Sequence, residues 1–139
     1  MSVKISTPLA DVWIDQEIGF VKIHRDIKSK ISLRGILEHY QVLNEMTDGK
    51  STHFICIVDK VEPFMMERIH RKMILRKYHL QARSVAFVVP DVRNTYLINL
   101  FCKLTPTKVP MKVFKSTKEA RCWLMRHRAH ESFSHGFSF

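Results

Sequence analysis

Glycine is scarce in this 139-residue sequence, and long apolar runs are absent. With four glycines there is no glycine-rich loop able to wrap a phosphate group, and no Gly-x-Ser-x-Gly elbow occurs. The longest apolar runs, Phe54–Val58 and Val85–Pro90, are far too short to cross a bilayer. Met1–Pro8 holds no apolar core of a secretion signal. We therefore expect a cytoplasmic protein without a membrane span.

Cysteine and histidine do not fall into metal-binding patterns. Cys56, Cys102 and Cys122 are odd in number and lack the spacing of a zinc site. We expect three buried or half-buried thiols in a reducing compartment. The eight histidines are scattered, without a His-x-x-x-His or His-Glu-x-x-His motif. No metal and no other cofactor is expected, and the lack of a catalytic constellation favours a protein that is not an enzyme.

The rest of the composition is typical of one ordinary globular domain. The chain is 45% hydrophobic and 26% charged, and it is long enough to bury a core without disulfides or metals. Residues 1–130 are assigned to this single domain. Residues 131–139 are rich in Ser, His and Phe, and we expect them to form a flexible C-terminal tail.

The net charge of +10 is concentrated in the second half of the chain. Residues 1–59 carry seven Lys/Arg and eight Asp/Glu, whereas residues 60–139 carry sixteen and five. Such asymmetry indicates an acidic partner, which could be nucleic acid, an anionic membrane surface or an acidic protein. The alternative is a basic face that only keeps the protein soluble.

The strands are predicted from short runs of β-forming residues. Residues 11–15 and 18–24 predict a β-hairpin, with a turn at Gln16-Glu17 that is looser than the Asn-Gly type. Alternation in the second run predicts one face in water, with His24 as an exposed strand residue rather than a ligand. The uniformly apolar Phe54–Val58 predicts a strand buried on both faces. It would run parallel to a second buried strand at 82–90 through a helical crossover.

The helices are predicted from caps and apolar spacing. The first covers residues 32–46, is expected to bury Ile36, Leu37, Tyr40 and Leu43, and is stopped by a left-handed Gly49. Another begins at Pro63 and runs to about 79. The third helix follows Asp91, which caps it. The fourth helix follows the capping box Ser116-x-x-Glu119 and runs to about Arg128. The third helix has an apolar stripe of Tyr96, Leu97, Leu100, Phe101 and Leu104.

A short edge strand is expected at 111–114, between the last two helices. The predicted order is therefore β-β-α-β-α-β-α-β-α. Alternation of strands and helices after an opening hairpin indicates an α/β domain, with a single mixed β-sheet and helices packed on the sheet.

The run Val113-Phe-Lys-Ser-Thr-Lys-Glu-Ala-Arg-Cys-Trp-Leu124 resembles the C-terminal unit of bacterial SpoIIAA-like, STAS-type domains. The resemblance rests on a short strand ending in Phe, a Ser/Thr cap, Glu-Ala, and then Trp-Leu. The Pro-rich approach and the opening hairpin extend it over about residues 8–128, and the chain is most similar to small Bacteroidetes-type members. The resemblance implies a SpoIIAA-like fold and a non-enzymatic regulatory or ligand-sensing module.

The resemblance also points to the stretch Asp59–Met66. In the anti-sigma-factor antagonists of this superfamily, a partner kinase phosphorylates a Ser or Thr at the start of the helix after the central strand. Asp59–Met66 contains no Ser or Thr, which implies that this switch is missing here. Glu62 places a fixed negative charge near the helix start, either imitating a phosphorylated residue or acting as an ordinary helix-capping charge.

The leading hypothesis is a module that docks a partner protein through residues 59–66 and the basic helix 63–79. The side chains expected to carry this contact combine the junction carboxylates with cations that share one helix face. They are Asp59, Glu62, Arg68, Arg71, Lys72 and Arg76.

Two other hypotheses remain. The similarity of SpoIIAA-like and CRAL-TRIO-like lipid-transfer domains suggests a small hydrophobic ligand or lipid, held by Tyr96, Leu100 and Phe101. Nucleic-acid binding rests on charge alone and is the weakest, because the aromatic residues are not interleaved with the basic ones. Whether the protein is a monomer or a homodimer stays open.

Overall fold

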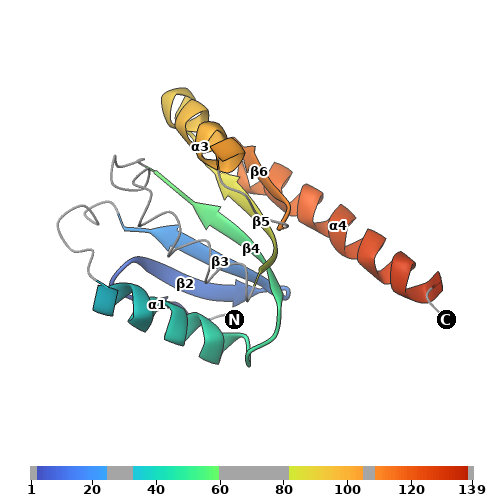
Figure 1. Cartoon of the computed structure of the whole chain (residues 1–139), viewed down its shortest axis with the longest axis horizontal. Coiled ribbons are helices and arrows are strands. Elements are labelled where there is room, and N and C mark those ends of the chain that lie inside the picture. The colour runs from blue at the N-terminus through green and yellow to red at the C-terminus, as the bar shows by residue number, and fades with distance from the viewer. Residues whose placement is uncertain (1–2, 25–32, 60–81, 105–108, 138–139) are drawn as a thin grey trace.

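The structure is a computed structural model that describes residues 3–24, 33–59, 82–104 and 109–137. Within these ranges one mixed six-stranded sheet carries helices on its faces, which confirms the predicted α/β class (Figure 1). The strands are β1 Ile5–Ser6, β2 Ala10–Asp15, β3 Ile18–Ile23, β4 Thr52–Ile57, β5 Ala82–Val88 and β6 Met111–Phe114. The helices are α1 Leu33–Met46, α3 Val92–Leu104 and α4 Thr117–Phe137. The helix predicted at 63–79 lies outside the described residues.

The six strands stand side by side in the order in which they occur in the chain. β1, β2 and β3 pair antiparallel, while β3, β4, β5 and β6 pair parallel. The sequence had not predicted β1, which adds a short strand to one edge, whereas β6 is the edge strand that was expected. Because chain order equals spatial order, the strands of the first half of the sequence lie toward one edge of the sheet and those of the second half toward the other, as the colour gradient in Figure 1 shows.

The hairpin of β2 and β3 is tighter than predicted. Asp15 pairs with Ile18, and the two residues between them have positive φ angles, 51° at Gln16 and 67° at Glu17. Two left-handed residues in a two-residue loop match the twist of the flanking strands, so the loose turn expected from Gln-Glu is wrong. The strain of two side chains at positive φ is the reason that the sequence gives little sign of this turn.

β3 is a central strand rather than a half-exposed one. Ile18, Gly19, Phe20 and Val21 are all buried, and only Lys22 points fully into water. The predicted wet face is therefore wrong, because β4 and the helices enclose this strand. A Cβ atom at Gly19 would lie 2.4 Å from Cε1 of Phe54 on β4, so glycine is needed where the Phe54 ring crosses β3.

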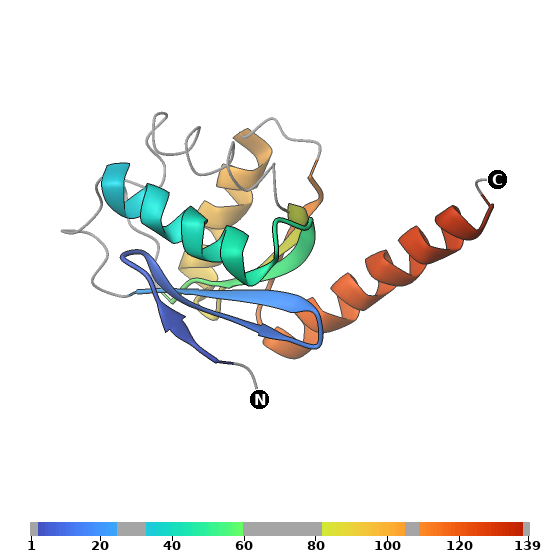
Figure 2. The ribbon, with the colours of Figure 1, turned by 90° about the horizontal axis from the view of Figure 1, so that it is seen from below.

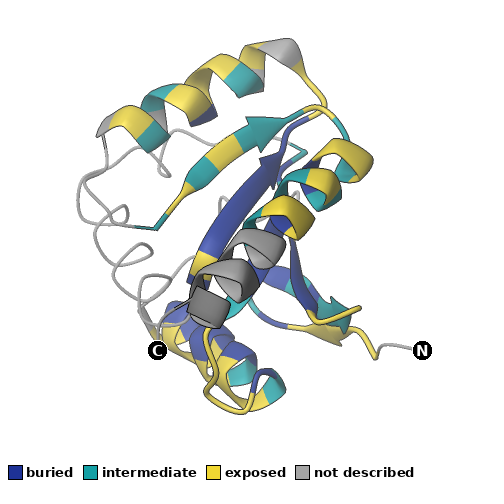
Figure 3. Cartoon of the chain, turned by 90° about the vertical axis from the view of Figure 1, so that its right-hand side faces the viewer, coloured by how far each residue is buried: buried dark blue, intermediate teal, exposed yellow. Residues whose placement is uncertain are grey.

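The core has two layers, one on each face of the sheet (Figure 2). Alternate residues of β4 point to opposite layers. Phe54 and Cys56 pack under α1 and α3, whereas Ile55 packs with Ala120 and Leu124 of α4. Figure 3 shows the central strands mostly buried while each helix keeps exposed residues on its outer face. The prediction that β4 and β5 are buried on both faces and parallel is confirmed.

α1 and α3 pack on the same face of the sheet, which we call the first face. The sequence predicted the buried side of α1 better than that of α3. On α1, Ile36, Tyr40 and Leu43 are buried as expected, but Leu37 is 48% exposed. On α3 the expected stripe is wrong at Tyr96 and Leu97, which are 70% and 37% exposed, whereas Ile98, which was not expected, is buried. α3 packs on the edge strand β6.

α4 covers the second face and runs further than expected. Ser116 caps it, because the N–H of Glu119 donates to the Ser116 hydroxyl at 3.3 Å. Arg121 fastens it to the β2–β3 turn through Asp15 at 2.7 Å and the Gln16 amide oxygen at 3.2 Å. The helix continues to Phe137 instead of ending near Arg128, since no proline interrupts it. Its far end extends away from the sheet (Figure 2).

A buried histidine that the sequence did not single out fixes α1 to the start of β2. His39 is 1% exposed, and its Nδ1 lies 2.7 Å from the hydroxyl of Thr7. The same hydroxyl contacts the backbone of Leu9 and Ala10. His24 was expected to be exposed, but it is half-buried, and its Nε2 lies 2.8 Å from the carbonyl of Thr7. Thr7 thus joins two histidines from separate elements.

Burial of His39 should make the fold acid-sensitive. Desolvation, with a smaller contribution from the charge of His24, lowers the pKa of His39 from 6.5 to about 4. Between these values the unfolded chain binds a proton that the folded chain does not, so stability falls as pH drops from 6.5 to 4. We expect this residue to remove about 3 kcal/mol over that range.

Urea denaturation at pH 7 and pH 4 measures this loss. His39→Gln keeps a polar group but cannot gain a charge, and it should show a smaller difference between the two pH values. His127→Gln, at a half-buried ring on α4, controls for the loss of an imidazole. An unchanged pH dependence in His39→Gln would contradict the assignment.

Candidate functional site

Most of the surface predicted to dock a partner lies outside the described residues. Of its six side chains only Asp59 is described, half-buried just after β4. Glu62, Arg68, Arg71, Lys72 and Arg76 all fall in the range 60–81. This surface therefore stays a prediction.

The residues predicted to hold a hydrophobic ligand lie on α3. Tyr96 is 70% exposed and Leu100 is half-buried, while the side chain of Phe101 is not described. A ligand bound at Tyr96 would lie on the outer surface of α3 and not between that helix and the sheet.

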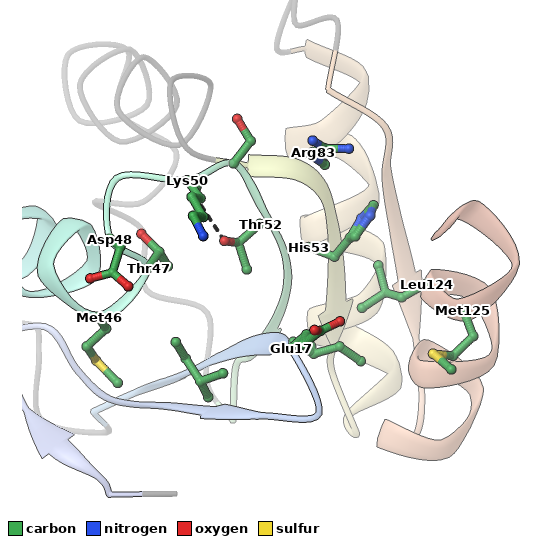
Figure 4. Close-up of a pocket in the computed structure, with 13 residues that line it drawn as sticks. Glu17, Met46, Thr47, Asp48, Lys50, Thr52, His53, Arg83, Leu124 and Met125 are labelled. Atoms are coloured by element: carbon green, nitrogen blue, oxygen red, sulfur yellow. Dashed lines mark hydrogen bonds between the residues drawn. The ribbon is translucent and has the colours of Figure 1, made fainter. Parts of the chain in front are cut away.

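A pocket of about 440 Å³ opens at the amino ends of β4 and β5 (Figure 4). Its wall is built by four separate parts of the chain: the β2–β3 turn with the adjoining strand ends, the stretch from the end of α1 into β4, the start of β5, and the middle of α4. The lining residues are Ile14, Glu17, Ile18, Met46, Thr47, Asp48, Lys50, Ser51, Thr52, His53, Arg83, Leu124 and Met125.

The pocket has apolar and charged parts in one space. Leu124 and Met125 of α4 lie on one side, and Met46 lies on the other (Figure 4). Lys50 and Arg83 bring positive charge, and Glu17 and Asp48 bring negative charge. A pocket with both signs and an apolar wall suits a small polar molecule that also has an apolar part.

His53 and Thr47 are the buried polar residues in the lining of this pocket, and His53 is the one that can take up a proton. It is 8% exposed, and its Nδ1 lies 2.6 Å from the hydroxyl of Ser84 on the neighbouring strand. This contact fixes the orientation of the imidazole ring. Although the pair has the spacing of a nucleophile and its base, Ser84 is fully buried, so its hydroxyl does not reach a substrate.

Sequence reasoning missed this pocket for a physical reason. It directed attention to Asp59, where β4 ends, whereas the pocket lies where β4 begins. Its residues come from four segments, and the sequence alone does not show that they meet. The buried His53 at the start of an otherwise apolar strand was the available signal.

The described charges are divided between the two sides of the sheet. Residues 3–59, as far as they are described, carry four Lys/Arg and seven Asp/Glu. The described residues from Ala82 to His127 carry eight Lys/Arg and two Asp/Glu. Because the strands follow chain order, most of this positive charge lies toward β5 and β6, although α4 brings Arg121 to Asp15 at the β2–β3 turn. Three exposed lysines, Lys112, Lys115 and Lys118, follow the outer strand into α4, and we call them the basic edge.

The three cysteines are free and differ in exposure, which corrects the expectation that all are at least half-buried. Cys56 is buried, Cys102 is intermediate and Cys122 is exposed on α4. Burial, together with the nearby Cys102, raises the pKa of Cys56 to about 12. Burial alone raises the pKa of Cys102 to about 11. Both thiols stay protonated at neutral pH and are poor nucleophiles.

We therefore expect one fast-reacting thiol per folded chain. Ellman's reagent at pH 8 should label Cys122 at once, and Cys56 and Cys102 only after unfolding in guanidinium. Cys122→Ser should abolish the fast phase, while Cys102→Ser, the matched control, should keep it. A fast phase that persists in Cys122→Ser would contradict this order of exposure.

Among the described residues there is no group of three His, Cys, Asp or Glu side chains able to hold a metal ion. Within the same ranges no helix is long and apolar enough to cross a membrane.

Comparison with known proteins gives one family. No curated protein and no solved structure matches the chain. A family model described as a domain of unknown function, DUF7793, matches residues 12–128. This range runs from within β2 through β6 and into α4, and leaves out the short edge strand β1. Since the match covers most of the sequence, the chain belongs to the DUF7793 family.

Proposed function

We propose that this domain is a non-enzymatic binding module that docks an acidic partner protein on the positive side of its sheet. The observation that carries the proposal is the separation of charge across the sheet, with eight Lys/Arg against two Asp/Glu in the described residues from Ala82 to His127. Glu119 is the one acidic residue between Met111 and His127. The free thiols make the reducing cytoplasm the natural place for such a contact.

Electrostatics explains how this side would select its partner. Charges on one side of a protein add into a field that steers an oppositely charged surface toward it and speeds encounter. Salt weakens this steering, because the screening length at physiological ionic strength is about 8 Å. The contact should therefore form quickly and weaken as salt is added.

The surface predicted from the sequence belongs to the same half of the chain. Residues 59–66 and the helix predicted at 63–79 lie between β4 and β5 in the sequence, and the proposal expects the cations Arg68, Arg71, Lys72 and Arg76 to add to the positive field. The resemblance to STAS-type domains supports a docking role. The missing Ser or Thr between residues 59 and 66 favours docking without control by phosphorylation.

A charge reversal at the basic edge tests the proposal. The triple variant Lys112→Glu, Lys115→Glu, Lys118→Glu should fold, since all three side chains are exposed and Glu is favourable in the first turn of α4. We expect it to capture at least tenfold less acidic protein from the native lysate in a quantitative pull-down at 50 mM salt.

The matched control reverses three exposed cations on the other half. Lys4→Glu, Lys22→Glu, Arg34→Glu changes the net charge by the same amount and should retain most of the captured protein. Equal losses in both triple variants would show that total charge, and not the basic edge, attracts the partner. Unchanged capture by the basic-edge variant would refute the docking surface.

A second candidate function is small-molecule binding in the pocket at the amino ends of β4 and β5. Its volume of about 440 Å³ falls in the range of ligand pockets, and its lining combines apolar and charged groups. This location differs from the predicted site at Tyr96, Leu100 and Phe101. The ligand would contact Leu124 and Met125, and thereby α4, the helix that continues the basic edge.

Native mass spectrometry of the purified protein tests this candidate. Wild type should carry an added non-protein mass, and Met125→Trp, which fills the pocket from an exposed position of α4, should lose it. Arg126→Trp adds the same ring one residue later, at a position that does not line the pocket, and should keep the mass. A wild-type spectrum without any added mass would count against a tightly bound ligand.

A further inference from the structure

β6 ends the sheet, and its outer edge is paired with no described strand. On its inner side, the N–H groups of Val85 and Val89 donate to the carbonyls of Pro110 and Phe114, both at 2.9 Å. Because bonding alternates along a parallel strand, the backbone groups of Met111 and Val113 point away from β5. An edge with outward N–H and C=O groups is a template for a further strand.

The side chains along this edge alternate in character. Met111 and Val113 are half-buried and pack against the core layer under α3. Lys112 points to the other face, where its ammonium lies 5.7 Å from the centre of the Phe114 ring. Lys115 comes directly after the last residue of β6 and is exposed. A strand lying beside β6 would therefore meet Met111 and Val113 on one face, and Lys112 with Phe114 on the other, with Lys115 just past the end of β6.

These lysines disfavour a second copy of this chain at the edge. If two β6 strands paired antiparallel through Met111 and Val113, Lys112 would lie directly opposite Lys112 of the copy. Like charges in directly opposed positions destabilise a strand pair. Lysines on an edge strand are also a common means of preventing such self-pairing.

The same lysines favour an acidic strand. A carboxylate placed opposite Lys112 would form a cross-strand ion pair, and its two neighbours would face Met111 and Val113. The opposite edge of the sheet is a shorter template for an added strand, because β1 has only two residues, Ile5 and Ser6. The geometry and the charge thus point to the same edge and to the same kind of partner.

We propose that an extended segment of the partner protein, alternating apolar and acidic residues, adds to β6 as a seventh strand. This inference rests on the proposed function and gives its mode of contact. Backbone hydrogen bonds to Met111 and Val113 would hold the segment, and Lys112 and Lys115 would select its charge.

A designed peptide provides the probe. It has eight residues alternating Val and Glu, is blocked at both ends and carries fluorescein, so that binding is read by fluorescence anisotropy. Two control peptides separate charge from strand pairing: one alternates Val and Lys, and one keeps every Glu but replaces a central Val by Pro, which cannot donate to a ladder. We expect the proline peptide to bind at least tenfold more weakly and the lysine peptide not to bind.

Hydrogen exchange of the same complex locates the contact. The amides of Met111 and Val113 should exchange fast in the free protein and at least tenfold more slowly when the Glu peptide is saturating. Lys112→Glu should weaken binding of the Glu peptide at least fivefold. Arg93→Glu, an equal charge change at an exposed site in the first turn of α3, should change it less than twofold.

The outcomes separate this inference from the function on which it rests. Equal binding of the Glu and proline peptides, with both amides still in fast exchange, would overturn strand addition while leaving acidic docking in place. Amides of Met111 and Val113 that are already protected in the free protein would also overturn it. If the Glu peptide fails to bind and the basic-edge variant captures as much as wild type, both proposals fall together.

Discussion

Burial of β3, β4 and β5 on both faces is the constraint on which the rest of the structure depends. Parallel strands need crossover connections, and right-handed crossovers in a sheet that grows in one direction lie on one face. α1 and α3 pack in the core layer of that face. The opposite layer, with Ile55, Ala86 and Val88, has only α4 to cover it in the described part of the chain. α4 therefore packs Ala120 and Leu124 against this layer and shields it from water.

The placement of α4 in turn shapes both candidate sites. Arg121 reaches Asp15 and Gln16 in the tight β2–β3 turn, which brings Leu124 and Met125 against the amino ends of β4 and β5 and closes one side of the pocket. At its other end the helix begins just after β6, so its first turn presents Lys118 beside the basic strand. One helix thus forms a wall of the pocket and extends the positive surface.

The order of the strands determines where the charge imbalance of the sequence lies on the folded protein. The basic excess in the second half of the sequence would be spread over the whole molecule if the strands were interleaved. Here the strands lie in chain order, so an imbalance along the chain becomes an imbalance across the sheet. The proposed docking of an acidic partner and the proposed strand addition at β6 both draw on this single feature.

Much of the fold could be predicted from sequence, because uniformly apolar runs such as Phe54–Val58 and caps such as Ser116 are local signals. The errors occurred where tertiary contacts decide. Tyr96 and Leu97 of α3 belong to the predicted apolar stripe but are exposed, and the turn at Gln16-Glu17 adopts positive φ without glycine. The pocket could not be predicted, since its walls come from four segments. The charge imbalance could be counted, but its location needed the strand order.

The most direct test of the central claim is an NMR titration of the labelled protein with poly-glutamate at low and at physiological salt. If the positive side of the sheet is the docking surface, the largest amide shifts will cluster in residues 111–121 and shrink as salt is added. Shifts that are largest in the acidic half of the sheet, at β2 and α1, would contradict it.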